Sequence, residues 1–391
     1  MSHDPAHTSL DQSTSTSSTN IQFSSNDKYG GLIKRKMTKQ IRDRLYLLLN
    51  YFDNTVPQFY ILHTVISIWR AIQFIGPSIM AASTLLWVPN SIASNGVSVI
   101  SVIFHLVPPE YRPKSTIFIE LIYFVFLLAF FIALIGASYY FKETAKLSSK
   151  SSSFLTIFMN TFLYILPPIA INISGEVLST IIQGDETNFP LALEIICIIL
   201  VLFISVFNLY VFHHVIALTV TYRPTSFMTT FSTPQVLIAL FTYLTTFLTA
   251  VASHLSQLPQ AILLIVTAIV YFLSFSVILY PGTCVSLRNR VLLFCCSCSG
   301  CLNCLCLAIY VILEKHADQP QFFVFIAIIV ASYIGGYFVT VFIDRRRIDL
   351  LNSFSENQEN ASLIKSSTHF LRLACTGFEY AHPACLNWTF F

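Results

Sequence analysis

The sequence is poor in charge. Of its 391 residues only 10% are Asp, Glu, Lys or Arg, whereas 55% are hydrophobic. Water-soluble domains carry about a quarter charged residues, so this chain has too few polar groups to cover a globular surface. The low charge excludes an ordinary soluble domain and predicts an all-α, polytopic transmembrane helix bundle.

The sequence also lacks the motifs of soluble enzymes. It has no glycine-rich phosphate loop, no H-E-x-x-H and no nucleophile elbow. We therefore expect no enzymatic activity, no cofactor, no metal and no nucleic-acid partner.

Six of the ten cysteines lie in one apolar run. Three-residue steps along a helix spread thiols in a stripe, whereas zinc needs four converging ligands.

Composition divides the chain into four segments. Residues 1–30 are rich in Ser, Thr, Asn and Gln and are predicted to be a disordered tail. Residues 31–58 form a basic stem, residues 59–343 a transmembrane domain, and residues 344–391 a linker followed by the start of a helical segment. No cleavable signal peptide is expected, because the first 58 residues carry no apolar core with a small-residue cleavage site.

Eight apolar runs approach or exceed the roughly 20 residues that a helix needs to cross a bilayer. They lie near residues 60–87, 115–141, 154–182, 190–220, 236–256, 260–281, 291–313 and 322–343. The last run meets its first charge at Asp344, and Arg345, Arg346 and Arg347 follow. Basic residues beside a span stay on the cytoplasmic side, so these arginines anchor a topology with both termini in the cytoplasm. We expect the plasma membrane rather than an internal one.

One further segment would change this topology. Residues 91–107 are short and are interrupted by Asn95 and Gly96. We interpret them as a re-entrant or interfacial piece. If they form a ninth span, one terminus moves to the outside.

The basic stem carries a mixed pattern. Residues 34–52 contain six Lys and Arg together with apolar residues at helical spacing. This pattern predicts an amphipathic helix from Thr38 to Asp53 that lies on the inner leaflet and attracts anionic lipids. The alternative is a solvated basic stem.

Ionisable residues within spans are functional candidates, because they are costly in lipid. Glu120, Glu176 and Glu194 fall in the outer parts of three consecutive spans. They could form one outward-facing cation or amine site, or they could separately reach water at the helix ends. Arg70 lies in the inner half of the first span, where its long side chain can also reach the interface.

Two prolines, Pro167 and Pro168, interrupt the third predicted span. They remove two backbone donors and so predict a helix break whose carbonyls are open to a ligand or a neighbouring helix. A simple kink is the alternative, and it is the favoured one.

Small residues mark two more candidate sites. Cys295 and Cys296 lie just past two arginines, a position typical of palmitoylation, although packing against other helices is equally compatible. In the last span, Gly335 and Gly336 close two small-x-x-x-small pairs that would let another helix, within the chain or in an oligomer, approach closely.

The tail carries a resemblance to a known family. Phe370 to Trp388 reads F-L-R-x-A-x-x-G, followed by H-P-x-C-L-x-W. With the basic stem and many spans before it, this layout resembles the N-terminal membrane region of the large tiny-macrocysts-type proteins of protists. It is similar too to trichomonad receptor-like adenylate/guanylate cyclases. In those families helical repeats follow, and some members later carry a cyclase domain.

Two functions from different classes follow. The resemblance implies a membrane-anchoring and possibly sensing region of a receptor-like signalling protein, without catalytic activity of its own. The aromatic end of the tail leaves rings without partners, so we expect the chain to continue into a repeat domain. The alternative is a transporter or channel that uses Glu120, Glu176 and Glu194.

Overall fold

The structure, a computed structural model, describes most of the chain from residue 40 to residue 356. Within this range it leaves out isolated positions between 42 and 58 and the segments 81–86, 88–90, 106–111, 185–188, 215–231, 280–286 and 315–318. The chain divides into two units, residues 1–40 and 41–391, and the helices below belong to the second. The predicted disordered tail, and the Phe370 to Trp388 motif that carries the resemblance, lie outside the described residues.

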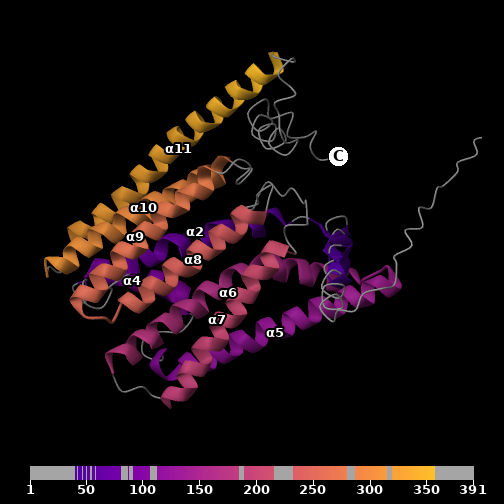
Figure 1. Cartoon of the computed structure of the whole chain (residues 1–391), viewed down its shortest axis with the longest axis horizontal. Helices are drawn as coiled ribbons and strands as arrows, with labels where there is room; N and C mark the ends of the chain where they lie inside the picture. Colours follow the sequence, from indigo (N-terminus) through magenta and orange to yellow (C-terminus); the bar gives the residue numbers. More distant parts are fainter. Residues whose placement is uncertain are drawn as a thin grey trace, which may run out of the picture. The chain divides into compact units, whose positions relative to one another are not determined.

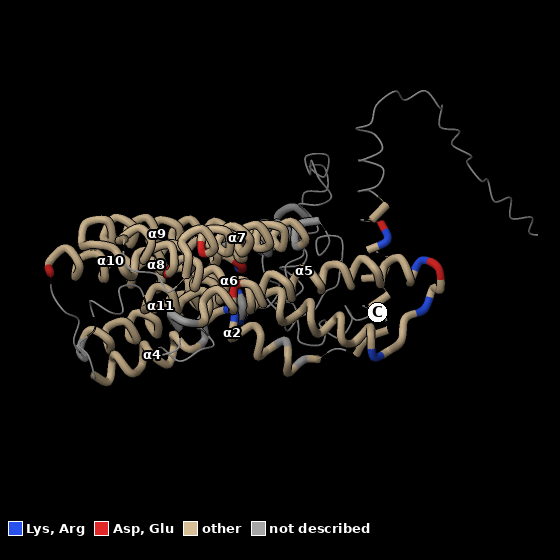
Figure 2. The backbone as a smooth tube through the Cα atoms, turned by 90° about the horizontal axis from the view of Figure 1, so that it is seen from below, with Lys and Arg blue, Asp and Glu red and all other residues tan. Residues whose placement is uncertain are grey.

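The described elements are α-helices, as the sequence predicts (Figure 1). Their bounds are α2 Tyr60–Met80, α4 Ile92–His105, α5 Arg112–Thr144, α6 Ser149–Gln183, α7 Leu191–His214, α8 Ser232–Ala252, α9 Gln257–Leu279, α10 Leu287–Ile312 and α11 Gln319–Glu356. Figure 2 shows that most of the helical backbone carries no charged residue. This scarcity suits lipid as the surrounding solvent.

Six of these helices are long and apolar enough to cross a membrane, namely α5, α6, α7, α9, α10 and α11. They fit a multi-pass membrane protein. The other two predicted spans correspond to α2 and to α8, whose described apolar stretch Val236–Ala252 is shorter. The count of eight spans therefore stays a prediction.

Residues 91–107 contain the 14-residue helix α4. At about 1.5 Å per residue it rises about 21 Å, less than the roughly 30 Å of a hydrocarbon core. It packs against α2, α6 and α11. This length is compatible with the interfacial or re-entrant interpretation.

Local sequence explains the ends of α6. The Ser148 hydroxyl accepts a hydrogen bond of 3.2 Å from the Ser151 amide, a standard N-cap. At the other end, Gly184 adopts a left-handed conformation with φ of 75°, and its N–H bonds back to Ile181 O. The two caps define the ends of the 35-residue helix α6.

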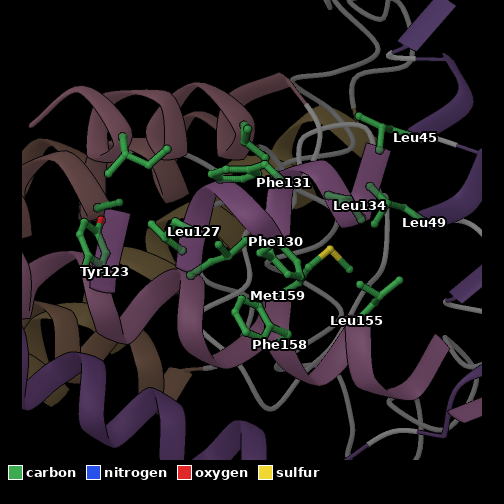
Figure 3. Packing of buried hydrophobic residues seen from close by; sticks show 14 of the residues in the cluster. Leu45, Leu49, Tyr123, Leu127, Phe130, Phe131, Leu134, Leu155, Phe158 and Met159 are labelled. Atoms are coloured by element: carbon green, nitrogen blue, oxygen red, sulfur yellow. The ribbon is translucent and has the colours of Figure 1, made fainter. Parts of the chain in front are cut away.

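The largest buried apolar cluster, which we call the aromatic core, joins α5, α6, α7 and α8. Its centre is formed by phenylalanines, and the rings of Phe130 and Phe158 stack with centroids 4.1 Å apart (Figure 3). Aromatic pairs of this kind contribute about 0.5–1.5 kcal/mol beyond the area they bury.

The basic stem contributes to the same core. The chain is helical at the described positions between Ile41 and Phe52, as predicted, and Leu45, Leu48, Leu49 and Phe52 are buried in the aromatic core. The sequence predicts that this apolar face lies on the inner leaflet. In the structure it packs instead against protein, because α5 and α6 present a matching apolar surface (Figure 3).

Two smaller clusters join α2, α4, α8, α9, α10 and α11. At the α9–α10 contact, Gly300 lies against the ring of Tyr271, and an added Cβ would come within 2.5 Å of that ring. The Tyr271 hydroxyl donates a 2.5 Å hydrogen bond to Phe74 O of α2. A single tyrosine thus connects α9 with α2 and α10.

Candidate functional site

The three predicted carboxylates have different environments in the structure. Glu120 of α5 and Glu194 of α7 are buried, at 1% and 3% exposure, and interact electrostatically. The hydroxyl of Ser174 in α6 donates a 2.6 Å hydrogen bond to Glu120 Oε1. Among the described residues, Glu120 Oε2 has no hydrogen-bond partner. The Glu120 carboxyl and the Ser174 hydroxyl therefore meet where α5 and α6 pack, and the Glu194 carboxyl of α7 is near enough to act on Glu120 electrostatically.

Glu176 has a different environment. It is half-buried, and its Oε1 accepts a 3.5 Å hydrogen bond from the Asn172 amide one turn earlier in α6. Ser174 and Glu176 are two residues apart, which on a helix places them on different faces. The structure therefore places Glu194 near enough to act electrostatically on Glu120, whereas Glu176 accepts a hydrogen bond from Asn172 of its own helix.

The prolines do not interrupt the helix that contains them. The sequence allows a break or, as the favoured alternative, a kink at Pro167 and Pro168. The structure has no break, because α6 runs as one α-helix from Ser149 to Gln183 with both prolines buried. Pro167 cannot donate to Leu163 O, its normal partner four residues earlier. The buried Asn208 amide of α7 donates to that oxygen instead, at 3.0 Å. A neighbouring helix thus supplies the missing donor.

A second amide reaches the same turn from the other side. Gln73 of α2 is 1% exposed, and its Nε2 donates a 2.8 Å hydrogen bond to Ile165 O. The Asn208 amide also donates to the Tyr243 hydroxyl of α8, at 3.1 Å. Sequence reasoning missed both amides. The available signal was one Asn and one Gln inside mainly apolar helices.

The strongest polar contact that sequence reasoning missed joins α10 to α11. Arg290 Nη2 and Asp344 Oδ2 are 2.5 Å apart, and the two side chains are 4% and 1% exposed. Each residue stands at the edge of its apolar run, and the two runs are consecutive. Consecutive antiparallel helices bring such edges together, so the pairing was available as a signal.

The arginines that follow take no part in this buried pair. Arg345 and Arg346 are exposed, and the Arg346 guanidinium lies 5.3 Å from the centre of the Phe342 ring. The helix continues through Arg347 to Glu356. The predicted topology anchors are therefore part of α11 itself.

Both candidate lipidation cysteines face other helices. Cys295 and Cys296 are each 3% exposed. The Cys295 thiol donates to Ile329 O of α11 at 3.3 Å, and the Cys296 thiol to Ala71 O of α2 at 3.6 Å. This burial favours the packing alternative over palmitoylation, which needs an accessible thiol.

The two glycines of the last span have different roles. Gly336 packs against α10, where an added Cβ would lie 2.8 Å from the Phe294 ring. At Gly335 an added Cβ would meet nothing within 4 Å. Gly336 thus serves a contact inside the chain, and only Gly335 leaves space for another helix.

The part of the chain that the structure describes contains no cluster of three or more His, Cys, Asp or Glu that could hold a metal ion. Comparison with models of known protein families, with curated proteins and with solved structures finds no match to this chain.

Proposed function

We propose that this chain is the membrane-anchoring and sensing region of a receptor-like signalling protein, with no catalytic activity of its own. The proposal places it in the plasma membrane with both termini in the cytoplasm. The observation that carries it is the geometry of α11, a single helix of 38 residues that runs through the arginine triplet to Glu356.

The length of α11 suits a transmitting element. At about 1.5 Å per residue it measures about 57 Å, nearly twice the thickness of a hydrocarbon core. About half of it therefore extends beyond the bilayer without a break in its hydrogen-bonded backbone. A displacement of the membrane part would move the distal end by a rigid-body shift.

The packing of α11 leaves it free to shift. It is the least buried of the six candidate spans and packs mainly against α10. Its buried stripe runs from Phe325 over seven residues to Ser332 and then in four-residue steps through Gly336, Thr340 and Asp344. Such a narrow contact can slide or rotate without opening the aromatic core, which contains no α11 residue.

The Arg290–Asp344 pair fixes this helix at the end of its apolar run. A buried ion pair with a 2.5 Å contact holds one register between α10 and α11, because any other register leaves two charges in a low-dielectric setting. Breaking this ion pair would therefore change the position of the part of α11 that follows Asp344.

The experiment attaches one fragment of a split luciferase after Glu356 and measures, in cells, the luminescence that it produces with the complementary fragment. Arg290→Gln and Asp344→Asn should each change the signal several-fold. Arg288→Gln, an exposed arginine on the same helix two residues away, is the matched control and should not change it. Equal signals from all four proteins would contradict α11 as the transmitting element.

One observation favours transport as the second candidate. Glu120 and Glu194 are both buried, and Glu120 is hydrogen-bonded to the Ser174 hydroxyl. Such oxygen atoms are suitable ligands for a monovalent cation or an amine. Flux into proteoliposomes would test it. Transport predicts that Glu120→Gln and Glu194→Gln abolish flux while Glu176→Gln does not. The receptor proposal predicts no flux in the wild-type protein.

A further inference from the structure

A small cavity lies where α2, α6, α8 and α10 meet, beside the proline turn of α6. Its lining includes Gln73 of α2, Pro168 of α6 and Tyr243 of α8, and mainly apolar residues complete the wall. The space accommodates one water-sized group. A metabolite, a hydrated ion or a lipid headgroup is therefore too large for it, and only a single very small molecule fits.

Gln73 supplies a hydrogen-bond acceptor to this cavity. Its side chain is 1% exposed, and its Nε2 donates a 2.8 Å hydrogen bond to Ile165 O. Its Oε1 is buried and has no hydrogen-bond partner among the described residues. Pro168, in the same wall, has no N–H to donate. A buried amide oxygen is unfavourable without a hydrogen bond, and ordered water supplies the donor where the protein does not.

Tyr243 supplies a hydrogen-bond donor to the same cavity. Its side chain is 6% exposed, and its hydroxyl oxygen accepts a 3.1 Å hydrogen bond from Asn208 Nδ2. A phenolic hydroxyl has one proton besides its acceptor lone pairs, so the bond from Asn208 leaves that proton available. A water molecule in the cavity can accept it and can donate one of its own protons to Gln73 Oε1.

The other polar side chains of the wall are bonded elsewhere. Thr242 Oγ1 donates a 2.8 Å hydrogen bond to a carbonyl of its own helix, and the Cys296 thiol donates to Ala71 O. The Arg70 guanidinium is engaged with the Tyr164 ring, 4.0 Å from its centre. The site proposed below makes no use of these three groups.

We propose that this cavity binds one ordered water molecule, which accepts a hydrogen bond from the Tyr243 hydroxyl and donates one to Gln73 Oε1. The water joins α2 to α8 beside the proline turn of α6, to which Gln73 is already bonded through Ile165 O. Buried water of this kind is part of a protein structure and is costly to remove. The inference does not rest on the receptor proposal, because the lining of the cavity includes no residue of α11.

The experiment is synchrotron hydroxyl-radical footprinting of the full chain in nanodiscs, with the oxidised residues identified by mass spectrometry. X-rays split a bound water molecule in place, so the radical oxidises the side chains beside it even where bulk solvent does not reach. Phe74, which lines the cavity, and Phe158 of the aromatic core are each 3% exposed and form a matched pair. Phe74 should be oxidised several-fold faster than Phe158.

Two glutamine variants test which group holds the water. Gln73→Leu removes the acceptor oxygen and should lower the oxidation rate of Phe74 to that of Phe158. Gln260→Leu is the control, because it makes the same change at a glutamine of α9 that is 2% exposed and does not line the cavity. This variant should leave the Phe74 rate unchanged.

The opposite results overturn the proposal. Equal rates at Phe74 and Phe158 in the wild-type protein would show that the cavity binds no water. An unchanged Phe74 rate in Gln73→Leu, or an equal fall in Gln260→Leu, would show that Gln73 does not hold it. If Gln73→Leu does not fold, Tyr243→Phe decides, because it removes the donor hydroxyl and keeps the ring. The Phe74 rate should then fall, and an unchanged rate refutes the site.

Discussion

The side-chain amide of Asn208 in α7 occupies the donor position that Pro167 vacates in α6, with its Nδ2 3.0 Å from Leu163 O. The proline and the asparagine lie 41 positions apart in the sequence, yet they act as one unit. A proline in the middle of a helix costs about 3 kcal/mol or more when its lost hydrogen bond is not replaced.

Replacing Asn208 with Leu should lower the free energy of unfolding by about 1–3 kcal/mol, because a buried carbonyl loses its donor. Thermal unfolding in nanodiscs measures this loss. The matched control is Asn160→Leu, since Asn160 donates to Thr156 O of its own helix and should cost little. Pro167→Ala restores the N–H, so in that background Asn208→Leu should cost clearly less. Equal costs in both backgrounds would contradict the pairing.

Gly335 and Gly336 offer a matched pair of adjacent positions. Gly336→Val should separate α11 from α10 and destabilise the protein by about 1–3 kcal/mol, because the new side chain overlaps the Phe294 ring. Gly335→Val should leave stability unchanged, since the space beside it is open. Thermal melts of the two variants provide the comparison. Equal melts would show that the α10–α11 contact is not as close as described.

Removal of one partner from the Arg290–Asp344 pair should destabilise the protein by about 3–5 kcal/mol, because the other charge stays buried. The double variant Arg290→Met with Asp344→Leu should recover most of this loss, since neither charge remains. Urea or thermal unfolding of the four proteins forms a double-mutant cycle. Additive losses would mean that the two side chains do not depend on each other.

Glu120→Gln should leave thermal stability unchanged or raise it. Two neighbouring buried carboxyl groups are costly when both are charged, and the amide oxygen can still accept from Ser174. Glu176→Gln, with its carboxyl on a half-buried face, is the control and should show a smaller effect. A marked loss of stability in Glu120→Gln would instead show that the negative charge is used, as a cation-binding transporter requires.

Much of the fold follows from the sequence, because helix type and helix position depend on local composition. The apolar runs at 115–141 and 154–182 became α5 and α6, and the basic stem became a helix at its described positions. What the sequence could not give was helix rotation. Glu120, Glu176 and Glu194 are at similar predicted depth, but only the rotation of each helix decides that Glu120 faces Ser174.

Contacts between helices were hidden for the same reason. The sequence around Pro167 does not show that an amide 41 residues later supplies the hydrogen-bond donor that the proline lacks. The Arg290–Asp344 pair is an exception, because both residues stand at the edges of consecutive apolar runs and their pairing could have been predicted. Lipid-facing and protein-facing apolar residues also look alike in sequence, so the burial of Leu48 and Phe52 was not foreseen.

The burial of the stem in the aromatic core has a consequence for synthesis. Leu49 emerges from the ribosome roughly 100 residues before Leu155, one of its partners in that core. At about 5–20 residues per second, the stem therefore exists for roughly 5–20 s before its binding surface has been made. We expect its basic, amphipathic character to let the membrane surface hold it during that interval. The lipid affinity of this segment would then serve as an assembly chaperone, and the α5–α6 hairpin would later displace the lipid.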